Sequence, residues 1–536
     1  MTLLCHPDRS LAQHVDEVMK AAEAILFRHS AEVAGCLEGV VHDAVQFHDV
    51  GKAQKEFQVY IKAPGQYRGD RKAKAHAPIS LCWWLALVLE GEIDVAHAIA
   101  VAALVWKHHG DFPILPDNDG LDTFVENNRE FLQKVIDTFP REQCGAELSL
   151  HLKEVDLGEI DDWLEDECDP GPFADMQPES RTKARLAAQF AFSILLQSDR
   201  AFLALSEEHI QQFLEQPAIQ LPPPNLVAHY CETKPTTPVS RQQTAVRELT
   251  VSNALKQPLS TVSLPTGMGK TLLGAQWILA QKQQSQKGKV IIVLPFLSVI
   301  DQTAKEYTSL LAGKEHLIQQ AHSLAEVDYL GRDKEDDWSD AQENVDDKKR
   351  EIENQAREFL AEIWEAPMVI TTFDQFLYAL FSQKRRHILK SHHLADACIV
   401  MDEIQAVPPK LWEPLSQALS SLARDFNTKC LVMSATQPGF LSSAVESVDA
   451  PENHFACRDR YELELLHREP MKLESFCLTI EEKLATDWRD KGVMIVLNTR
   501  KSARCVRDFI ADLGDERPLH FKIGRASCRE RVCHRV

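Results

Sequence analysis

The sequence lacks the long apolar runs, secretion signal and paired cysteines that would place it in a membrane or outside the cell. No apolar run reaches the roughly 18 residues that a membrane span needs, and the longest candidate, 81–89, is followed by Glu90 and Glu92. The N-terminus has no basic segment leading into an apolar one. The 13 cysteines include no C-x-x-C pair, which indicates reduced thiols rather than a disulfide framework. We therefore expect a cytoplasmic protein with no membrane partner.

Basic residues are also scarce, with 59 Lys and Arg against 80 Asp and Glu and a formal net charge of −21. Affinity for nucleic acid comes largely from cations that neutralise phosphates, so this charge argues at first against such a partner. The acidic residues are concentrated, however, in two runs, 154–175 and 326–347, each with ten of them. We interpret them as solvated loops or insertions. The net charge therefore does not exclude a local DNA groove.

The pattern of apolar residues changes once along the chain, which at 536 residues is too long for a single core. Spaced apolar positions predict helices up to residue 215, and six prolines between Pro217 and Pro238 predict a linker. Short apolar runs then alternate with helix-like segments, which predicts a parallel sheet with crossover helices. We expect a multidomain protein, an all-α domain followed by α/β lobes, with its parts at 1–215, 216–240 (linker), 241–445, 446–521 and 522–536.

A phosphate-binding loop is predicted at "LPTGMGKT", Leu264–Thr271, because it follows a strand-like run and opens a helix-like one. The backbone of Thr266, Gly267 and Gly269 would cradle phosphates. Lys270 would reach the β and γ phosphates, and Thr271 would ligate Mg²⁺. The usual first glycine of such a loop is replaced here by Leu264.

Two carboxylates end another apolar run, in "CIVMDEIQ". The carboxyl ends of parallel strands are where such folds bind ligands, so Asp402 would hold the Mg²⁺ and Glu403 would orient the attacking water. Further on, "MSATQP", Met433–Pro438, supplies a Ser-Ala-Thr signal.

The order of LPTGMGKT, VLPFLSVIDQ, VITTFDQF, DEIQ and MSAT resembles superfamily 2 helicases with two RecA-like lobes. The resemblance implies ATP as the nucleotide and places Gln242 or Gln243 at the adenine. Thr371, Thr372 and Gln302 lie at positions that suit contacts with a single-strand backbone, but each is equally a plain cap or turn residue.

The helical part contains His, His-Asp, Lys, His, His-His and Asp in an order that resembles HD-superfamily phosphohydrolases. The resemblance implies one metal bound by His14, His48, Asp49 and Asp199, and a second bound by His76, His108 and His109 together with a bridging Asp49. Lys52 would neutralise phosphate charge. Imidazole and carboxylate ligands suit transition metals, so we expect Mn²⁺, Co²⁺, Ni²⁺ or Fe²⁺ rather than Ca²⁺.

The two motif sets together resemble the CRISPR-associated nuclease-helicase of type I interference systems, over residues 10–520. That family is recruited by the RNA-guided Cascade complex to R-loop DNA, cuts the displaced single strand, and translocates 3'-5' with ATP. Two other functions stay open: a nucleotide phosphohydrolase gated by an ATPase domain, and a non-enzymatic adaptor.

The C-terminal region departs from the helicase pattern. After "GVMIVLNTRKSA" we expect the arginine-bearing motif of a second lobe, which the sequence up to Val536 does not contain. Residues 522–533, "KIGRASCRERVC", resemble a translated sequencing adapter, with a genuine basic tail as the alternative. We therefore expect a truncated chain, a foreign tail at 522–536, lost helicase activity, and a strand at 493–497 without sheet neighbours.

Overall fold

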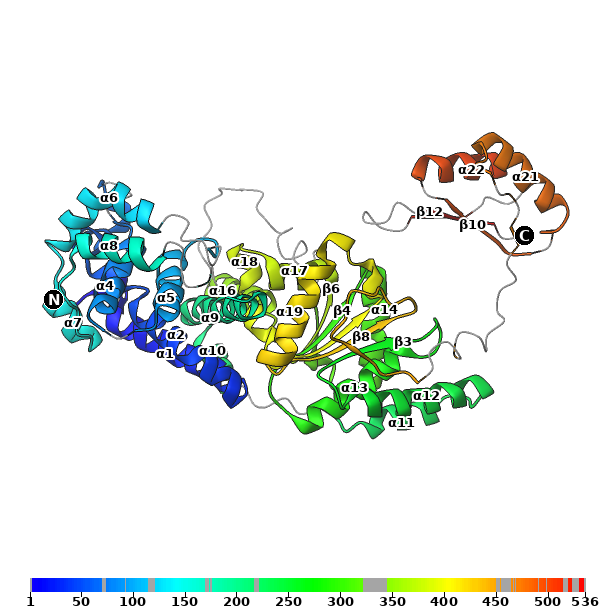
Figure 1. Ribbon diagram of the computed structural model, residues 1–536, viewed down its shortest axis with the longest axis horizontal. Helices are drawn as coiled ribbons and strands as arrows, with labels where there is room; N and C mark the ends of the chain where they lie inside the picture. The colour runs from blue at the N-terminus through cyan, green and yellow to red at the C-terminus, as the bar shows by residue number, and fades with distance from the viewer. Residues whose placement is uncertain are drawn as a thin grey trace. The chain divides into compact units, whose positions relative to one another are not determined.

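The computed structural model divides the chain into two compact units, Met1–Phe455 and Ala456–Val536, which are treated separately below (Figure 1). The residues described are 2–69, 74–91, 93–113, 121–168, 173, 176–215, 221–321, 345–449, 454, 464–465, 467, 469–489, 491–497, 499–513, 519–522 and 530–534. Among them, no helix combines the length and apolarity that crossing a bilayer requires. Part of the first predicted acidic run and most of the second lie outside these residues.

The first 215 residues form a helical domain, as the sequence predicts, preceded only by a short hairpin of β1 (Leu4–His6) and β2 (Arg9–Ser10). Its helices are α1 (Leu11–Phe27), α2 (Ala31–Phe47), α3 (Lys55–Lys62), α4 (Ala77–Glu90), α5 (Val95–Lys107), α6 (Leu121–Ile136), α7 (Arg141–Leu148), α8 (Leu157–Cys168), α9 (Pro178–Ala204) and α10 (Glu207–Leu214).

Local signals set the ends of these helices. Ser10 and Ser30 accept a hydrogen bond from a first-turn amide of α1 and α2, and Asp94 does so for α5. The middle of α9, Ala188–Asp199, is buried all round. It is buried because α1, α2 and α5 pack against it within the helical domain. Three helices of the following lobe also contact it: α16 (Val345–Glu362), α18 (Arg385–Ile388) and α19 (Trp412–Asp425).

An α/β lobe follows, built on a seven-stranded sheet with the order β5-β6-β4-β7-β8-β3-β9 (Figure 1). All strand pairs in it are parallel, as the alternating pattern predicts. The strands are β3 (Leu259–Ser263), β4 (Val290–Leu294), β5 (Ile318–Ala321), β6 (Met368–Thr372), β7 (Cys398–Asp402), β8 (Lys429–Ser434) and β9 (Val445–Glu446). The helices are α11 (Asn225–Glu232), α12 (Pro238–Ala254), α13 (Lys270–Gln284), α14 (Leu297–Leu310), α16 (Val345–Glu362), α17 (Phe373–Phe381), α18 (Arg385–Ile388) and α19 (Trp412–Asp425).

Part of the expected linker is helical. Within 216–240, α11 forms and its Val227 is fully buried against the α/β lobe. The prolines at 222–224 precede this helix, and Pro224 is its N-cap residue. No hydrogen bond within the helix needs their missing N–H groups.

Alternate residues of the central strands face two different cores. Ile291 and Val293 of β4 belong to a core that continues into the helical domain. Val290 and Ile292 belong to a second core, formed with α12, α13 and α14. One apolar core therefore joins the helical domain to one face of the sheet, so the two form a single packed unit.

The second unit contains α21 (Leu473–Ala485), α22 (Arg500–Asp512) and a three-stranded sheet of β10 (Val493–Leu497), β12 (Glu530–His534) and β11 (Leu519–Lys522). The expectation that β10 lacks sheet neighbours is wrong here, because β12 pairs antiparallel with both other strands. The backbone of 530–534, within the expected foreign tail, supplies the missing partner. Residues 523–529 and 535–536 lie outside the described part of the chain.

Candidate metal centre and nucleotide site

Four predicted ligands converge from three helices of the helical domain. His14 lies on α1, His48 and Asp49 end α2, and Asp199 lies on α9. Nε2 of His14 is 3.1 Å from Oδ2 of Asp49 and 3.3 Å from Oδ1 of Asp199, and Nε2 of His48 is 3.4 Å from the same Asp49 oxygen. One donor atom from each residue lies within 4.8 Å of the others, close enough to enclose a metal ion.

The other oxygen of Asp49 faces a second group of three histidines. Oδ1 lies 3.1 Å from Nε2 of His76 and 3.6 Å from Nε2 of His108, and His109 Nε2 lies 2.9 Å from that of His76. These four residues also meet the 4.8 Å limit. Asp49 thus lies between two groups of donor atoms, one facing each of its oxygens.

Backbone carbonyls orient two of the imidazole rings. Nδ1 of His48 lies 2.8 Å from the Val45 carbonyl oxygen, and Nδ1 of His108 lies 2.7 Å from that of Val105. A proton on each Nδ1 leaves Nε2 as the lone-pair atom, directed at Asp49. Two helix ends therefore hold both rings in the tautomer that binds a metal.

Burial sets the charge states of this cluster. It lowers the pKa of both His48 and His76 to about 4, so each ring is neutral at pH 7. Burial alone would raise the pKa of Asp49, but the charge of Lys52 holds it well below its usual range. Lys52 Nζ lies 2.6 Å from Oδ2 of Asp49.

The donor set fits a transition metal. The buried Nε2 atoms of His14 and His48 have no hydrogen-bond partner of acceptable geometry among the described residues, although both lie near carboxylate oxygens. Such buried nitrogens are costly unless a cation satisfies them. Of the seven ligands, His109 alone is exposed, so the centre opens to solvent at its side.

Two further residues at the centre have no counterpart in the sequence pattern. Cys5 and His6, on β1, bring donor atoms within 4.8 Å of each other and of His14. Burial raises the pKa of the Cys5 thiol to about 12, so the neutral thiol is a weak ligand. Only the three-dimensional pairing of β1 with β2 beside α1 places them here.

The predicted phosphate loop connects β3 to α13. Gly267 and Gly269 both have φ of 77°, a left-handed conformation that glycine adopts without strain. Gly269 caps α13, whose first residue is Lys270, so the loop amides and the helix N-terminus lie together. Gln243 on α12 donates to the Gly267 carbonyl at 2.7 Å, which brings the expected adenine-binding glutamine to this loop.

The two predicted acidic residues meet Lys270 at the carboxyl edge of the sheet. Lys270 Nζ lies 3.0 Å from Oε1 of Glu403 and 3.9 Å from Oδ1 of Asp402. Burial raises the pKa of Asp402 to about 6, helped by Glu403 and opposed by Lys270. Thr271 completes the expected set as the second residue of α13.

A hydrogen-bonded chain links these acids to the Ser-Ala-Thr motif. Gln405 donates to Oε2 of Glu403 at 2.6 Å, and Ser434 donates to Oε1 of Gln405 at 2.6 Å. Ser434 also accepts from the Thr436 amide at 2.9 Å. A displacement of Glu403 on nucleotide binding would therefore reach β8 directly.

Thr371, Thr372 and Gln302 are each expected either to contact DNA or to serve as a cap or turn residue. The first two have structural roles. Thr372 caps α17 by accepting from the Gln375 amide, and Thr371 is buried with its hydroxyl donated to the Ala321 carbonyl. Gln302 is exposed on α14 and remains available for contact.

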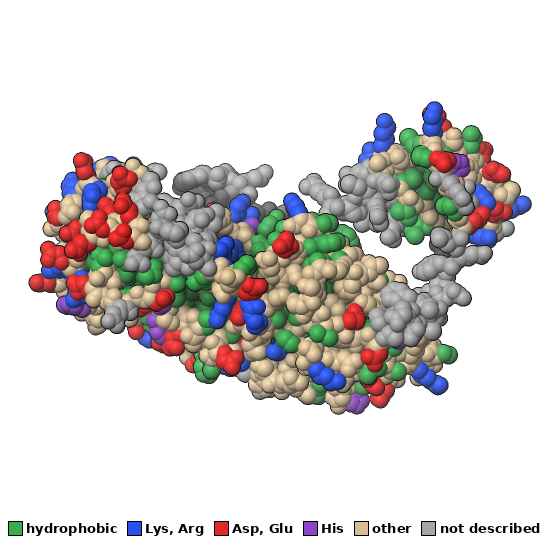
Figure 2. Space-filling model, viewed as in Figure 1, with side chains coloured by type: hydrophobic (Ala, Val, Ile, Leu, Met, Phe, Trp, Pro, Cys, Tyr) green, Lys and Arg blue, Asp and Glu red, His purple; other side chains and the backbone are tan. Residues whose placement is uncertain are grey.

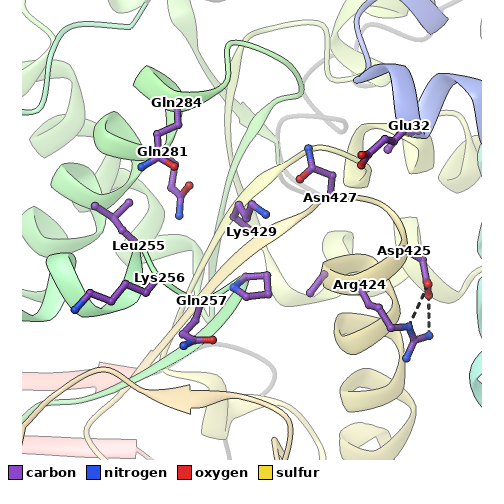
Figure 3. Close-up of a pocket in the computed structure, with 13 residues that line it drawn as sticks. Glu32, Leu255, Lys256, Gln257, Gln281, Gln284, Arg424, Asp425, Asn427 and Lys429 are labelled. Atoms are coloured by element: carbon purple, nitrogen blue, oxygen red, sulfur yellow. Dashed lines mark hydrogen bonds and ion pairs between the residues drawn. The ribbon is translucent and has the colours of Figure 1, made fainter.

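A polar hollow of about 360 Å³ lies elsewhere in the same unit, between α2 and the amino ends of β3 and β8 (Figure 3). Arg424 and Asp425 form an ion pair on its wall at 2.7 Å. It is on the opposite edge of the sheet from the phosphate loop and contains none of the predicted site residues. It is therefore not the nucleotide site.

Comparisons with known proteins match both halves of this arrangement. The family model of the Cas3 HD domain matches residues 7–191, and that of DEAD/DEAH box helicases matches residues 240–443. The CRISPR-associated nuclease/helicase Cas3 of Haloferax volcanii is 24% identical over 440 residues, which cover 74% of this chain and 45% of that protein.

Crystal structures of T. fusca Cas3 and T. fusca Cas3-AMPPNP superpose with TM-scores of 0.57 and 0.55, at 16% and 17% identity. Each comparison covers 94% of this chain and 62% of the T. fusca chain. The fold is shared. The chain spans about half the length of the curated relative and under two thirds of these structures.

Proposed function

We propose that this chain, which joins the HD and DEAD-box domains of a CRISPR-associated Cas3 nuclease-helicase, hydrolyses single-stranded DNA at a centre of two metal ions and hydrolyses ATP at its α/β lobe. In the whole protein, ATP hydrolysis drives 3'-5' translocation and unwinding, and the nuclease cuts the strand exposed in an R-loop. The Cascade complex recruits it there, in the cytoplasm.

The division of Asp49 between two ligand sets carries the nuclease proposal. Oδ2 faces His14 and His48, and Oδ1 faces His76 and His108. Metal ions bridged by one carboxylate supply a water nucleophile at neutral pH and stabilise the leaving oxygen of a phosphodiester. A cluster with only a structural role would not need seven convergent metal-donor atoms.

The chain's own residues prepare the substrate. The buried ammonium group of Lys52, next to Asp49, adds a positive charge that favours a phosphate at the centre. The exposed His109 leaves one open side through which a flexible single strand can bring its backbone. A duplex is too wide and stiff to present one phosphate at so enclosed a cluster.

In the α/β lobe, Lys270 would exchange Glu403 for the β and γ phosphates of ATP. Glu403, so released, would orient the attacking water, while Asp402 and Thr271 hold Mg²⁺. The left-handed backbone of Glu403, at φ 58°, turns its side chain toward Lys270 rather than along the strand.

The nuclease proposal is tested with circular single-stranded DNA, Mn²⁺ and no ATP. We expect cleavage by the unaltered chain and none by Asp49→Ala. Asp43→Ala is the matched control, because Asp43 is also on α2 but pairs with His97, at 2.7 Å, outside both ligand groups. Release of phosphate from free nucleotides with no DNA cleavage would instead favour a nucleotide phosphohydrolase.

A further inference from the structure

A run of three cations interrupts the surface of the α/β lobe where it meets the helical domain. Residues 382–387, Ser-Gln-Lys-Arg-Arg-His, follow α17 and include the first three residues of α18; they are called the basic segment below. Lys384 and Arg386 are exposed, and Arg385 is half-buried. Figure 2 shows that acidic side chains gather instead over the end of the helical domain that carries α6 and α8. In a chain of net charge −21, three consecutive cations at a domain boundary require a reason.

The basic segment is fixed to the loop that carries the metal ligand His109. The Arg385 amide donates to Oδ1 of Asp111 at 3.3 Å, and the Phe112 amide donates to the Gln383 carbonyl at 2.7 Å. Asp111 and Phe112 are the second and third residues after His109. The Phe112 ring packs on Phe192 of α9 with centroids 5.3 Å apart, so both partners of this contact are anchored.

The exposed ligand of the metal centre lies on the loop that is bonded to the basic segment. That ligand is His109. Burial lowers the pKa of Arg385, and the negative charge of Asp199 opposes that shift. The Nε of Arg385 is buried and has no hydrogen-bond partner in the described part of the chain.

An exposed aromatic ring lies beside the cations. His387 closes the basic segment by a 2.8 Å contact between its Nδ1 and the Ser382 hydroxyl. Tyr378 of α17 stacks on that imidazole, with centroids 4.5 Å apart and planes 10° apart, and keeps 46% of its surface exposed. Cations next to an exposed ring are the combination that binds a single strand, by phosphate contacts and base stacking.

We propose that Lys384, Arg385, Arg386 and Tyr378 of the α/β lobe hold the single strand of DNA whose phosphate reaches the metal centre of the helical domain. The nuclease site is then a composite of two domains, with metal ligands from one and the strand platform from the other. This rests on the proposed nuclease function and adds to it the surface that binds the substrate.

The test is Lys384→Ala/Arg386→Ala in the full chain, compared with Lys256→Ala/Lys314→Ala. The control pair is also exposed and removes the same charge, but Lys256 lines the hollow of Figure 3 and Lys314 follows α14, so neither belongs to the basic segment. Binding of a fluorescent single-stranded oligonucleotide is measured in chelator over a series of salt concentrations. Two lost phosphate contacts should reduce the slope of log K against log salt by about 1.4. The control should leave the slope unchanged.

Activity assays give a second readout. With Mn²⁺, the double variant should raise KM for single-stranded DNA about tenfold or more while its hydrolysis of bis(4-nitrophenyl) phosphate, which is too small to reach the platform, stays normal. Tyr378→Ala should weaken binding of the oligonucleotide to a similar degree. The single variants Lys384→Gln and Arg386→Gln serve if the double variant unfolds.

An unchanged salt slope and an unchanged KM in these variants would overturn the proposal. The binding measurement needs no cleavage, so it tests the platform even if the nuclease proposal fails. If the nuclease proposal itself is wrong, the unaltered chain will leave the DNA intact in Mn²⁺.

Discussion

Nζ of Lys270 lies 3.0 Å from Oε1 of Glu403, so the lysine expected to bind phosphate is paired with the acid expected to orient water. Both side chains are thus held at the carboxyl edge of the sheet, and each must leave the other when a triphosphate binds. The same Glu403 is the end of the hydrogen-bonded chain through Gln405 to Ser434. Nucleotide binding at Lys270 would therefore be coupled to β8 by a single exchange of partners.

Lys270→Ala should weaken ATP binding by about 10- to 100-fold, the usual effect of losing charge-assisted hydrogen bonds of about 1.5–3 kcal/mol. Cleavage of circular single-stranded DNA by the same variant should be normal, because the metal ligands lie on other elements. Titration with a fluorescent ATP analogue measures the first effect. Lys314→Ala is the control for the loss of a lysine, and loss of the nuclease in a folded Lys270→Ala chain would show that the two sites are not separate.

Asp402→Asn should stabilise the chain at pH 7 to 8 and have little effect at pH 4. The pKa of Asp402 is raised from 3.8 to about 6, so its ionised form is disfavoured in the folded chain. That cost is absent below the ordinary pKa, grows as pH rises from about 4 to about 6, and is then constant at no more than about 3 kcal/mol. Thermal melts across this pH range measure it. Asp301→Asn, an exposed carboxyl on α14, is the control, and an equal gain at pH 4 would contradict the assignment.

The seam between the helical domain and the α/β lobe depends on buried polar pairs. Ser193 Oγ on α9 lies 2.9 Å from Nδ1 of His392, and both side chains are buried. Ser193→Ala would leave that nitrogen unpaired, which should lower the free energy of unfolding of this unit by about 1–3 kcal/mol. Urea unfolding gives the value. Ser420→Ala, which breaks an exposed contact with Ser443, should cost less than about 0.5 kcal/mol.

Metal binding should stabilise the folded chain independently of any activity. Added Mn²⁺, Co²⁺ or Ni²⁺ should raise the Tm of chelator-treated protein, since a ligand that binds only the folded state stabilises it, and Ca²⁺ should do so much less. His48→Ala should reduce the increase, because it removes a buried donor of the first ligand group and leaves the second group in place. A variant of the exposed pair, His97→Ala, should keep it. An equal response to Ca²⁺ would argue for a carboxylate site instead.

The sequence predicts the ligand sets and the phosphate loop because these motifs keep fixed spacing within one local segment or match a known order. Gly267, Gly269 and Lys270 adopt the expected loop for that reason. Contacts between distant segments leave no such signal. The approach of Cys5 and His6 to His14, and the bonding of residues 383–385 to the His109 loop, arise only when the two domains share a core.

Burial is the other property that the local pattern does not give. Thr371 ends a strand in a position that suits a DNA contact, but the adjacent strand β5 covers it and its hydroxyl bonds to the Ala321 carbonyl. The sequence likewise does not predict that β10 pairs with residues 530–534, because that segment has no strand-like alternation of apolar and polar residues.

Metal content measured together with cleavage of circular single-stranded DNA tests the bridging role of Asp49 most directly. The unaltered chain, loaded with Mn²⁺ and freed of excess, should retain two ions and cut the DNA, because each oxygen of Asp49 faces its own set of histidines. Asp49→Ala should retain fewer ions and leave the circle intact, while Asp43→Ala behaves as the unaltered chain does. An Asp49→Ala chain that keeps both ions and cuts at the normal rate would contradict the two-metal centre.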